Sequence, residues 1–112
     1  MTAPAGGIVV QKYGGTSVAT PERILAIADR IAACLPDTPR LVVVLSAMGK
    51  TTDELVSLAH QVARQPRGRE MDLLLATGEH VSVSLLGLAL QDKGVPAISL
   101  TAAQRGIRTD NA

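Results

Sequence analysis

A lysine, two glycines and two hydroxyl side chains gather where the first apolar stretch of the sequence ends. The stretch 8–12 closes on Lys12, and the donors that follow are Gly14, Gly15, Thr16 and Ser17. Glycine lets a ligand come close to backbone N–H groups, and a lysine adds a full positive charge. Transfer of a phosphoryl group depends mainly on such charge stabilisation and on positioning. The stretch therefore predicts a phosphate site, although a glycine turn beside a surface lysine would explain it about equally well.

A second polar stretch, Ser46–Asp53, follows the valine-rich residues 41–45. Its Gly49-Lys50-Thr51 resembles the end of the phosphate-binding loop of many nucleoside triphosphatases. That motif needs a glycine five residues before Gly49, and the sequence has Val44 there, so we exclude it. Ser46 and Thr52 remain as candidate ligand-binding hydroxyls. Thr51 is predicted to cap a helix, with Glu54 three residues later completing a capping box.

Glu79 lies between two apolar stretches, which is an unfavourable place for a carboxylate without a partner. It can serve as the partner of a cationic substrate group such as an ammonium, or as an acid favoured in the first turn of a helix. The adjacent His80 is most simply a surface residue. Cys34 is the single cysteine and lies in an apolar helical pattern, so we interpret it as a small buried residue and not as a nucleophile.

The elements that must position these residues alternate between strands and helices. In order, we expect a strand at 8–12, a helix from Thr20 to Leu35, a strand at 41–45, a helix from Thr51 to Val62, a short helix at 70–75, a break at Thr77-Gly78-Glu79, a helix at 81–90 ending at Gly94, and a strand at 97–100. This order predicts an α/β fold with a parallel sheet, right-handed crossovers and helices on both faces. Ligands bind such sheets at the carboxyl ends of the strands, where the polar stretches lie.

Composition limits the classes of function. Of the 112 residues 46% are hydrophobic and 19% are charged, which indicates one small globular domain. The net charge is +1 and the only aromatic residue is Tyr13, so nucleic-acid binding is not expected. The longest apolar run, 81–90, contains two serines and a glycine and is too short to cross a membrane. The first residues do not resemble a signal peptide, so we expect a cytoplasmic protein.

Three blocks of the sequence resemble the aspartate kinases of the amino acid kinase superfamily. They are KYGGTSV (12–18), VVVLSAMGKTTDEL (42–55) and EMDLLLATGEHVSVSLL (70–86), and the resemblance extends from Ile8 to the end of the chain. KYGG alone also occurs in acetylglutamate kinase, whereas the remaining residues of the blocks favour aspartate kinase. The resemblance implies a three-layer α/β/α fold with a mainly parallel sheet, of which residues 1–112 would be the N-terminal portion.

The same resemblance implies an activity and a role for each site residue. Aspartate kinases transfer the γ-phosphoryl group of ATP, with Mg²⁺ bound through the nucleotide, to the side-chain carboxylate of L-aspartate. This reaction opens lysine, methionine and threonine biosynthesis. Lys12 would be catalytic and would bind the ATP phosphates together with Gly14, Gly15, Thr16 and Ser17. The aspartate would be bound by Ser46, Thr52 and Glu79, and no metal ligand is expected in this chain.

The chain departs from the family pattern in its length. Family members continue into a nucleotide-binding half and ACT-type regulatory domains, so we expect residues 1–112 to be a truncated part that is inactive alone. The full-length enzyme is expected to be a homo-oligomer. Two alternatives remain: another amino acid kinase such as acetylglutamate kinase, or a non-catalytic α/β binding fragment.

Overall fold

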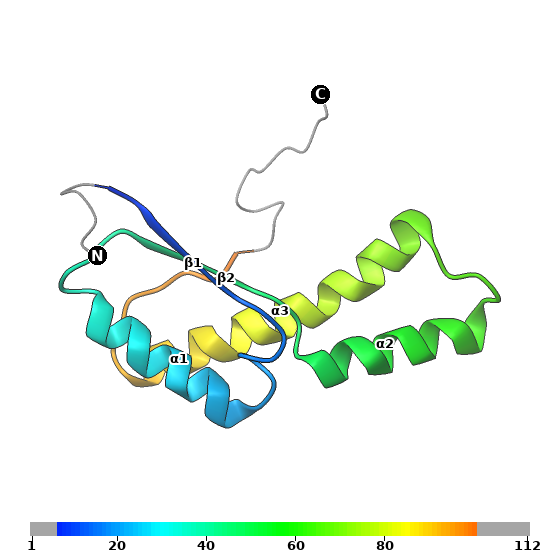
Figure 1. Ribbon diagram of the computed structural model, residues 1–112, viewed down its shortest axis with the longest axis horizontal. Helices are drawn as coiled ribbons and strands as arrows, with labels where there is room; N and C mark the ends of the chain where they lie inside the picture. The colour runs from blue at the N-terminus through cyan, green and yellow to red at the C-terminus, as the bar shows by residue number, and fades with distance from the viewer. Residues whose placement is uncertain (1–6, 101–112) are drawn as a thin grey trace.

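The computed structural model describes residues 7–100 as two parallel strands and three helices (Figure 1). In chain order they are β1 (Val9–Tyr13), α1 (Pro21–Cys34), β2 (Leu41–Leu45), α2 (Gly49–Val62) and α3 (Gly68–Asp92). The strands pair in register from Val9 with Leu41 to Tyr13 with Leu45. The predicted α/β class with a parallel sheet is confirmed.

Helix α1 begins as its sequence predicts. The side chain of Thr20 accepts a hydrogen bond from the N–H of Arg23 at 3.3 Å, and Pro21 occupies the first helical position. Both features stabilise a helix start, because a cap satisfies an unpaired N–H group and proline has none to satisfy. The buried positions recur at helical spacing and form one apolar stripe: Ile24, Ile27, Ala28 and Ile31.

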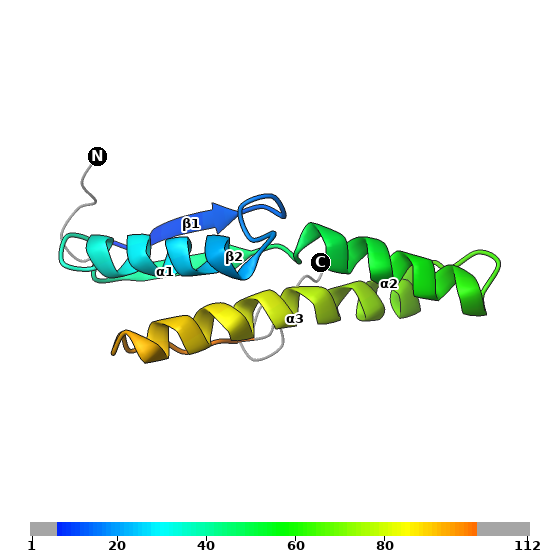
Figure 2. The same cartoon turned by 90° about the horizontal axis from the view of Figure 1, so that it is seen from below.

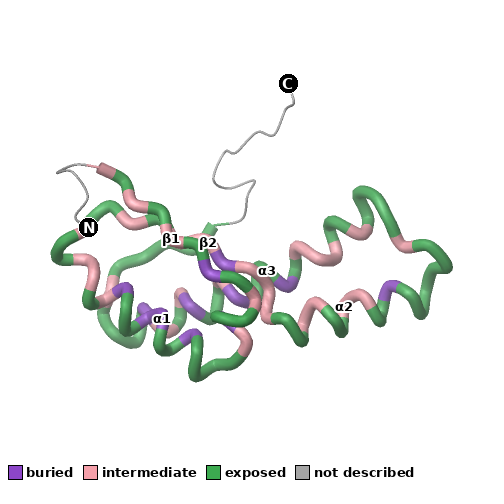
Figure 3. The backbone as a smooth tube through the Cα atoms, in the orientation of Figure 1, coloured by how far each residue is buried: buried purple, intermediate pink, exposed green. Residues whose placement is uncertain are grey.

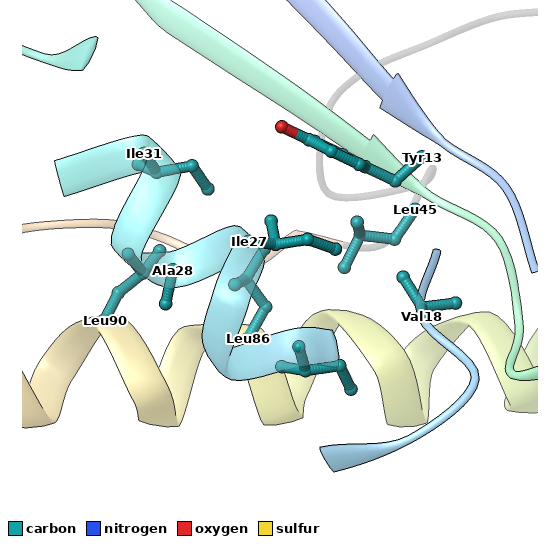
Figure 4. Close-up of a cluster of buried hydrophobic side chains, with 9 residues drawn as sticks. Tyr13, Val18, Ile27, Ala28, Ile31, Leu45, Leu86 and Leu90 are labelled. Atoms are coloured by element: carbon teal, nitrogen blue, oxygen red, sulfur yellow. The ribbon is translucent and has the colours of Figure 1, made fainter. Parts of the chain in front are cut away.

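The hydrophobic core lies on one face of the sheet. Tyr13 and Leu45, at the ends of the two strands, point toward α1 and toward Leu86 and Leu90 of α3 (Figure 4). Helices α1 and α3 pack against each other on this side of the strands (Figures 1 and 2). Side chains alternate between the faces of a strand, so Val10 faces away from the core and is 62% exposed. Residues 7–100 thus supply one helical layer, and the second predicted layer does not lie among them.

Helix α3 is continuous over 25 residues, so the predicted break at Thr77-Gly78-Glu79 is wrong. Gly78 is buried inside the helix, and a Cβ placed on it would lie only 2.9 Å from the Cβ of Ala47. The glycine therefore permits a close contact between α3 and the loop after β2. In the sequence alone, a glycine of this kind looks the same as one that interrupts a helix.

The predicted end of α3 is confirmed. Gly94 has a φ of +72°, a conformation that favours glycine. Its N–H donates to the carbonyl of Gln91 at 3.0 Å, and the N–H of Val95 donates to the carbonyl of Leu90 at 2.9 Å. These two bonds form a Schellman motif, which satisfies carbonyl groups at the helix end.

The predicted capping box at the start of α2 is wrong. The helix begins at Gly49, its N-cap is Met48, and no side chain caps it. Thr51 and Thr52 both lie inside the first helical turn. The helix therefore starts three residues earlier than the capping pattern indicated, with Met48 in place of Thr51 as the N-cap, and the hydroxyl of Thr51 is not used as a cap.

The predicted strand at 97–100 is also wrong, since these residues form no strand in the described part of the chain. The hydroxyl of Ser99 donates to the carbonyl of Val83 at 3.3 Å and ties this segment to α3. With β2 and α3, residues 95–100 line an apolar cavity of about 300 Å³. The segment therefore lies beside α3 and does not form a hydrogen-bonded ladder with β2.

Because α3 is continuous, it is long and apolar enough to cross a membrane, with a mean hydropathy of 1.6 over its most apolar stretch. The expectation that no apolar run approaches this length does not hold. Helix α3 packs on α1, α2 and β2. Figure 3 shows its buried positions mainly in the half that lies beside α1, whereas the hairpin formed with α2 is largely exposed.

Candidate functional site

An open cleft of about 520 Å³ lies at the carboxyl ends of the two strands. It is formed by the loop after β1, the loop after β2, the first turn of α2, and α3. Its lining residues are Gly15, Ser46, Ala47, Gly49, Thr52, Asp53, Leu75 and Glu79. The structure thus brings together the three residues that the sequence analysis assigned to the amino acid, Ser46, Thr52 and Glu79, and places Gly15 beside them.

Backbone hydrogen bonds hold the two hydroxyl residues of the cleft in place. The N–H of Ser46 donates to the carbonyl of Tyr13 at 3.0 Å, which joins the loop after β2 to the end of β1. The N–H of Thr52 donates to the carbonyl of Met48 at 3.1 Å as the first bond of α2. The preceding N–H groups of α2 have no partner within the helix, and they give this end a partial positive charge. Hydroxyl groups and N–H donors therefore lie together on this side of the cleft.

Glu79 brings a carboxylate to the opposite side of the cleft from α3. Its side chain is exposed and is not enclosed by the apolar residues around it in sequence. Asp53 also lines the cleft, and among residues 7–100 these two carboxylates are its only charged lining residues. This charge favours a ligand with a positive group.

The sequence analysis did not identify Asp53 as a cleft residue. A signal for it was present, since Asp53 follows Thr52 directly in the stretch 46–53. Leu75, which also lines the cleft, precedes Glu79 by four residues and so lies on the same side of α3. Leu75 and Glu79 share this side only because α3 is one continuous helix, which the sequence analysis did not predict.

The loop after β1 is only partly in the cleft. A turn closes it, with the N–H of Ser17 donating to the carbonyl of Gly14 at 3.0 Å. The carbonyl of Thr16 accepts a hydrogen bond from Nη1 of Arg23 at 2.8 Å. Of the five predicted phosphate-binding residues, Gly15 alone lines the cleft.

Ser17 lines a different and smaller groove of about 210 Å³, where Arg23 and Arg30 also lie. Both of these arginine side chains are exposed. The turn at Gly14–Ser17 therefore separates two hollows, one with carboxylates and one with arginines.

Lys12 lies on the exposed face of β1, opposite the layer formed by α1 and α3. It is in register with Val44 of β2, and its side chain is exposed. Among residues 7–100 it forms no hydrogen bond or ion pair, and it does not line the cleft.

Comparisons with known proteins agree with the fold and the motifs. The model of the amino acid kinase family matches residues 7–112. Aspartokinase 2 of Bacillus subtilis (strain 168) is 57% identical over 104 residues, which cover 93% of this chain and 26% of that protein. An aspartokinase of Thermus thermophilus is 54% identical over 103 residues, which cover 92% of this chain and 25% of that protein.

A solved structure gives the same result. The crystal structure of aspartate kinase from Synechocystis superposes with a TM-score of 0.78 at 58% identity, covering 84% of this chain and 16% of that chain. The chain spans about a quarter of the length of the curated relatives it matches. The strands, the helices and the sequence blocks all agree with these relatives, and the chain belongs to the amino acid kinase family.

Proposed function

We propose that this chain is part of an aspartate kinase, which uses ATP to phosphorylate the side-chain carboxylate of L-aspartate and yields 4-phospho-L-aspartate and ADP. The observation that carries the proposal is the meeting of Ser46, Thr52 and Glu79, from three separate segments, in one cleft beside Gly15. The relatives named aspartokinase support it, since they match most of this chain.

The cleft suits an amino acid that has one positive and two negative groups. The carboxylate of Glu79 would bind the ammonium of aspartate, with Asp53 adding negative charge nearby. The hydroxyls of Ser46 and Thr52 and the N–H groups at the start of α2 would bind a carboxylate, because helix N-termini favour anions. An amino acid bound in this way has its ammonium toward α3 and a carboxylate toward α2.

The phosphoryl donor would approach from the loop after β1. Gly14, Gly15, Thr16 and Ser17 would bind the ATP phosphates, and Lys12 would stabilise the charge on the γ-phosphoryl group as it moves from ADP to the aspartate carboxylate oxygen. Such positioned charges supply most of the catalysis in phosphoryl transfer. Mg²⁺, bound through the nucleotide, would neutralise phosphate charge; residues 7–100 contain no group of three His, Cys, Asp or Glu side chains that could hold a metal ion.

The chain would be the N-terminal part of the amino acid kinase domain and inactive alone, with a nucleotide-binding half and ACT regulatory domains in other parts of a longer protein. This agrees with the quarter of each curated relative that it spans. The net charge of +1 and the packing of α3 in the core support a cytoplasmic enzyme that binds neither nucleic acid nor membrane. We also propose that the complete enzyme is a homo-oligomer.

The test is the substrate preference of the complete natural protein that carries this segment. With ATP and hydroxylamine, L-aspartate should give an acyl hydroxamate, whereas N-acetylglutamate should give none. Acetylation removes the ammonium that Glu79 is proposed to bind, so this pair of substrates separates aspartate kinase from acetylglutamate kinase. Turnover of N-acetylglutamate alone, or substrate binding without turnover, would overturn the proposal.

A further inference from the structure

Three segments of the cleft meet where Gly78 lacks a side chain. A Cβ on Gly78 would lie 2.9 Å from the Cβ of Ala47, 3.4 Å from Cδ1 of Leu55 and 3.5 Å from Cγ2 of Thr51. The first distance is shorter than carbon atoms normally approach, whereas the other two are close to ordinary contacts. Gly78 is buried inside α3. An added methyl group would therefore have to push α3 away from the loop after β2.

Each residue that we propose to bind aspartate is the chain neighbour of a residue at this contact. The pairs are Ser46 with Ala47, Thr52 with Thr51, and Glu79 with Gly78. Consecutive Cα atoms are held about 3.8 Å apart by the planar peptide, so a movement at the contact carries over to the neighbouring residue. The packing around Gly78 and the geometry of the cleft are thus closely linked.

We propose that Gly78 is a positioning residue for the amino-acid half of the site, an inference that rests on the proposed aspartate kinase function. Its missing side chain sets the spacing between α3 and the loop after β2, and with it the distance from the Glu79 carboxylate to the hydroxyls of Ser46 and Thr52. Alanine is a better helix former than glycine. A glycine at position 78 is therefore consistent with a site where the close approach of α3 to the loop after β2 matters more than helix propensity.

The first part of the test is Gly78→Ala in the complete natural protein. The KM for aspartate should rise at least about tenfold, because binding groups displaced by a fraction of an ångström no longer hold the substrate in the correct orientation. The KM for ATP should change less, since the atoms nearest to a Cβ on Gly78 belong to Ala47, Leu55 and Thr51 and none of them to the loop after β1. A general loss of stability would not separate the two KM values in this way.

The second part is compensation across the contact. Ala47→Gly removes the atom that an alanine at position 78 would meet at 2.9 Å. The double variant Gly78→Ala with Ala47→Gly should therefore recover most of the wild-type KM for aspartate. If the single variant Gly78→Ala does not fold, the double variant is compared with the wild type directly. A KM for aspartate in the double variant equal to that of the wild type then supports the proposal.

The matched control lies farther along the same helix. A Cβ on Gly87 would lie 2.6 Å from Oγ of Ser99 and 3.9 Å from its Cβ, so Gly87→Ala with Ser99→Ala adds a methyl group to α3 without a clash. This variant should leave both KM values unchanged. Equal effects of Gly78→Ala on both KM values, or no recovery in the double variant, would overturn the positioning role. A wild type without aspartate kinase activity would instead overturn the proposed function.

Discussion

A Cβ atom on Gly15 would lie 3.3 Å from the carbonyl oxygen of Ala47, so the loops that follow β1 and β2 approach each other closely through their backbones. A Cβ on the neighbouring Gly14 would meet nothing within 4 Å. Gly78 approaches the other side of Ala47, at its Cβ. Ala47 therefore lies between the proposed phosphate loop and the helix that carries Glu79.

The different surroundings of the two glycines predict different effects of adding a methyl group. Gly15→Ala should raise the KM for ATP about tenfold, because the backbone oxygen of Ala47 cannot rotate away and the loop must move. Gly14→Ala should have a smaller effect. Steady-state kinetics of the complete protein would test the pair. A larger effect at Gly14 would show that close packing is not the reason for glycine at position 15.

Lys12→Ala should lower kcat at least about a hundredfold, the usual effect of removing a group that stabilises transition-state charge. The free energy of unfolding should hardly change, because the Lys12 side chain is exposed and has no partner among residues 7–100. Lys50→Ala, which removes another exposed lysine from the first turn of α2, is the control and should keep kcat within a few-fold of the wild type. A kcat for Lys12→Ala in the same range would remove Lys12 from the catalytic role.

Glu79→Gln should raise the KM for aspartate about tenfold or more and leave the KM for ATP nearly unchanged. The substitution keeps the shape of the side chain and removes the charge that would bind the substrate ammonium. Glu54→Gln changes an exposed carboxylate of α2 that does not line the cleft, and it should have no effect on either KM. If Glu79→Gln changed both KM values equally, an ammonium partner at this position would be wrong.

Gly94→Ala should lower the free energy of unfolding by about 1 kcal/mol, because an alanine at a φ of +72° is strained. Gly49→Ala is the matched comparison, since Gly49 has no positive φ and a Cβ there meets nothing within 4 Å. It should leave stability unchanged or raise it slightly. Chemical denaturation of the complete protein measures both. Equal changes would mean that the Schellman motif does not depend on glycine.

Residues with local signals were predicted well from the sequence. Thr20 and Pro21 mark the start of α1, and Gly94 marks the end of α3, because caps depend on a few neighbouring residues. The meeting of Gly15 and Ser46 in one cleft followed from the rule that loops after parallel strands share one edge. These features need no knowledge of distant contacts.

Two of the wrong predictions, the helix break at Gly78 and the strand at 97–100, depended on contacts between distant residues. Gly78 was predicted to break a helix. The residue that explains a glycine at this position is Ala47, whose Cβ it approaches and which lies 31 positions away in the sequence. Residues 97–100 have a strand-like composition, but Ser99 is tied to α3. Asp53 was overlooked because its place in the cleft depends on where α2 begins.

The face of the sheet that no helix covers among residues 7–100 predicts self-association of the 112-residue chain. Val10 and Val42 are paired across the two strands and are 62% and 43% exposed. Exposed apolar side chains beside free strand edges favour aggregation. Val10→Thr with Val42→Thr keeps β-branched residues and should reduce the associated fraction seen by size-exclusion chromatography with light scattering. Val62→Thr, at an 87% exposed position on α2, is the control and should leave that fraction unchanged. A monomeric wild-type chain, or equal effects of the two sets of substitutions, would contradict this role of the sheet face.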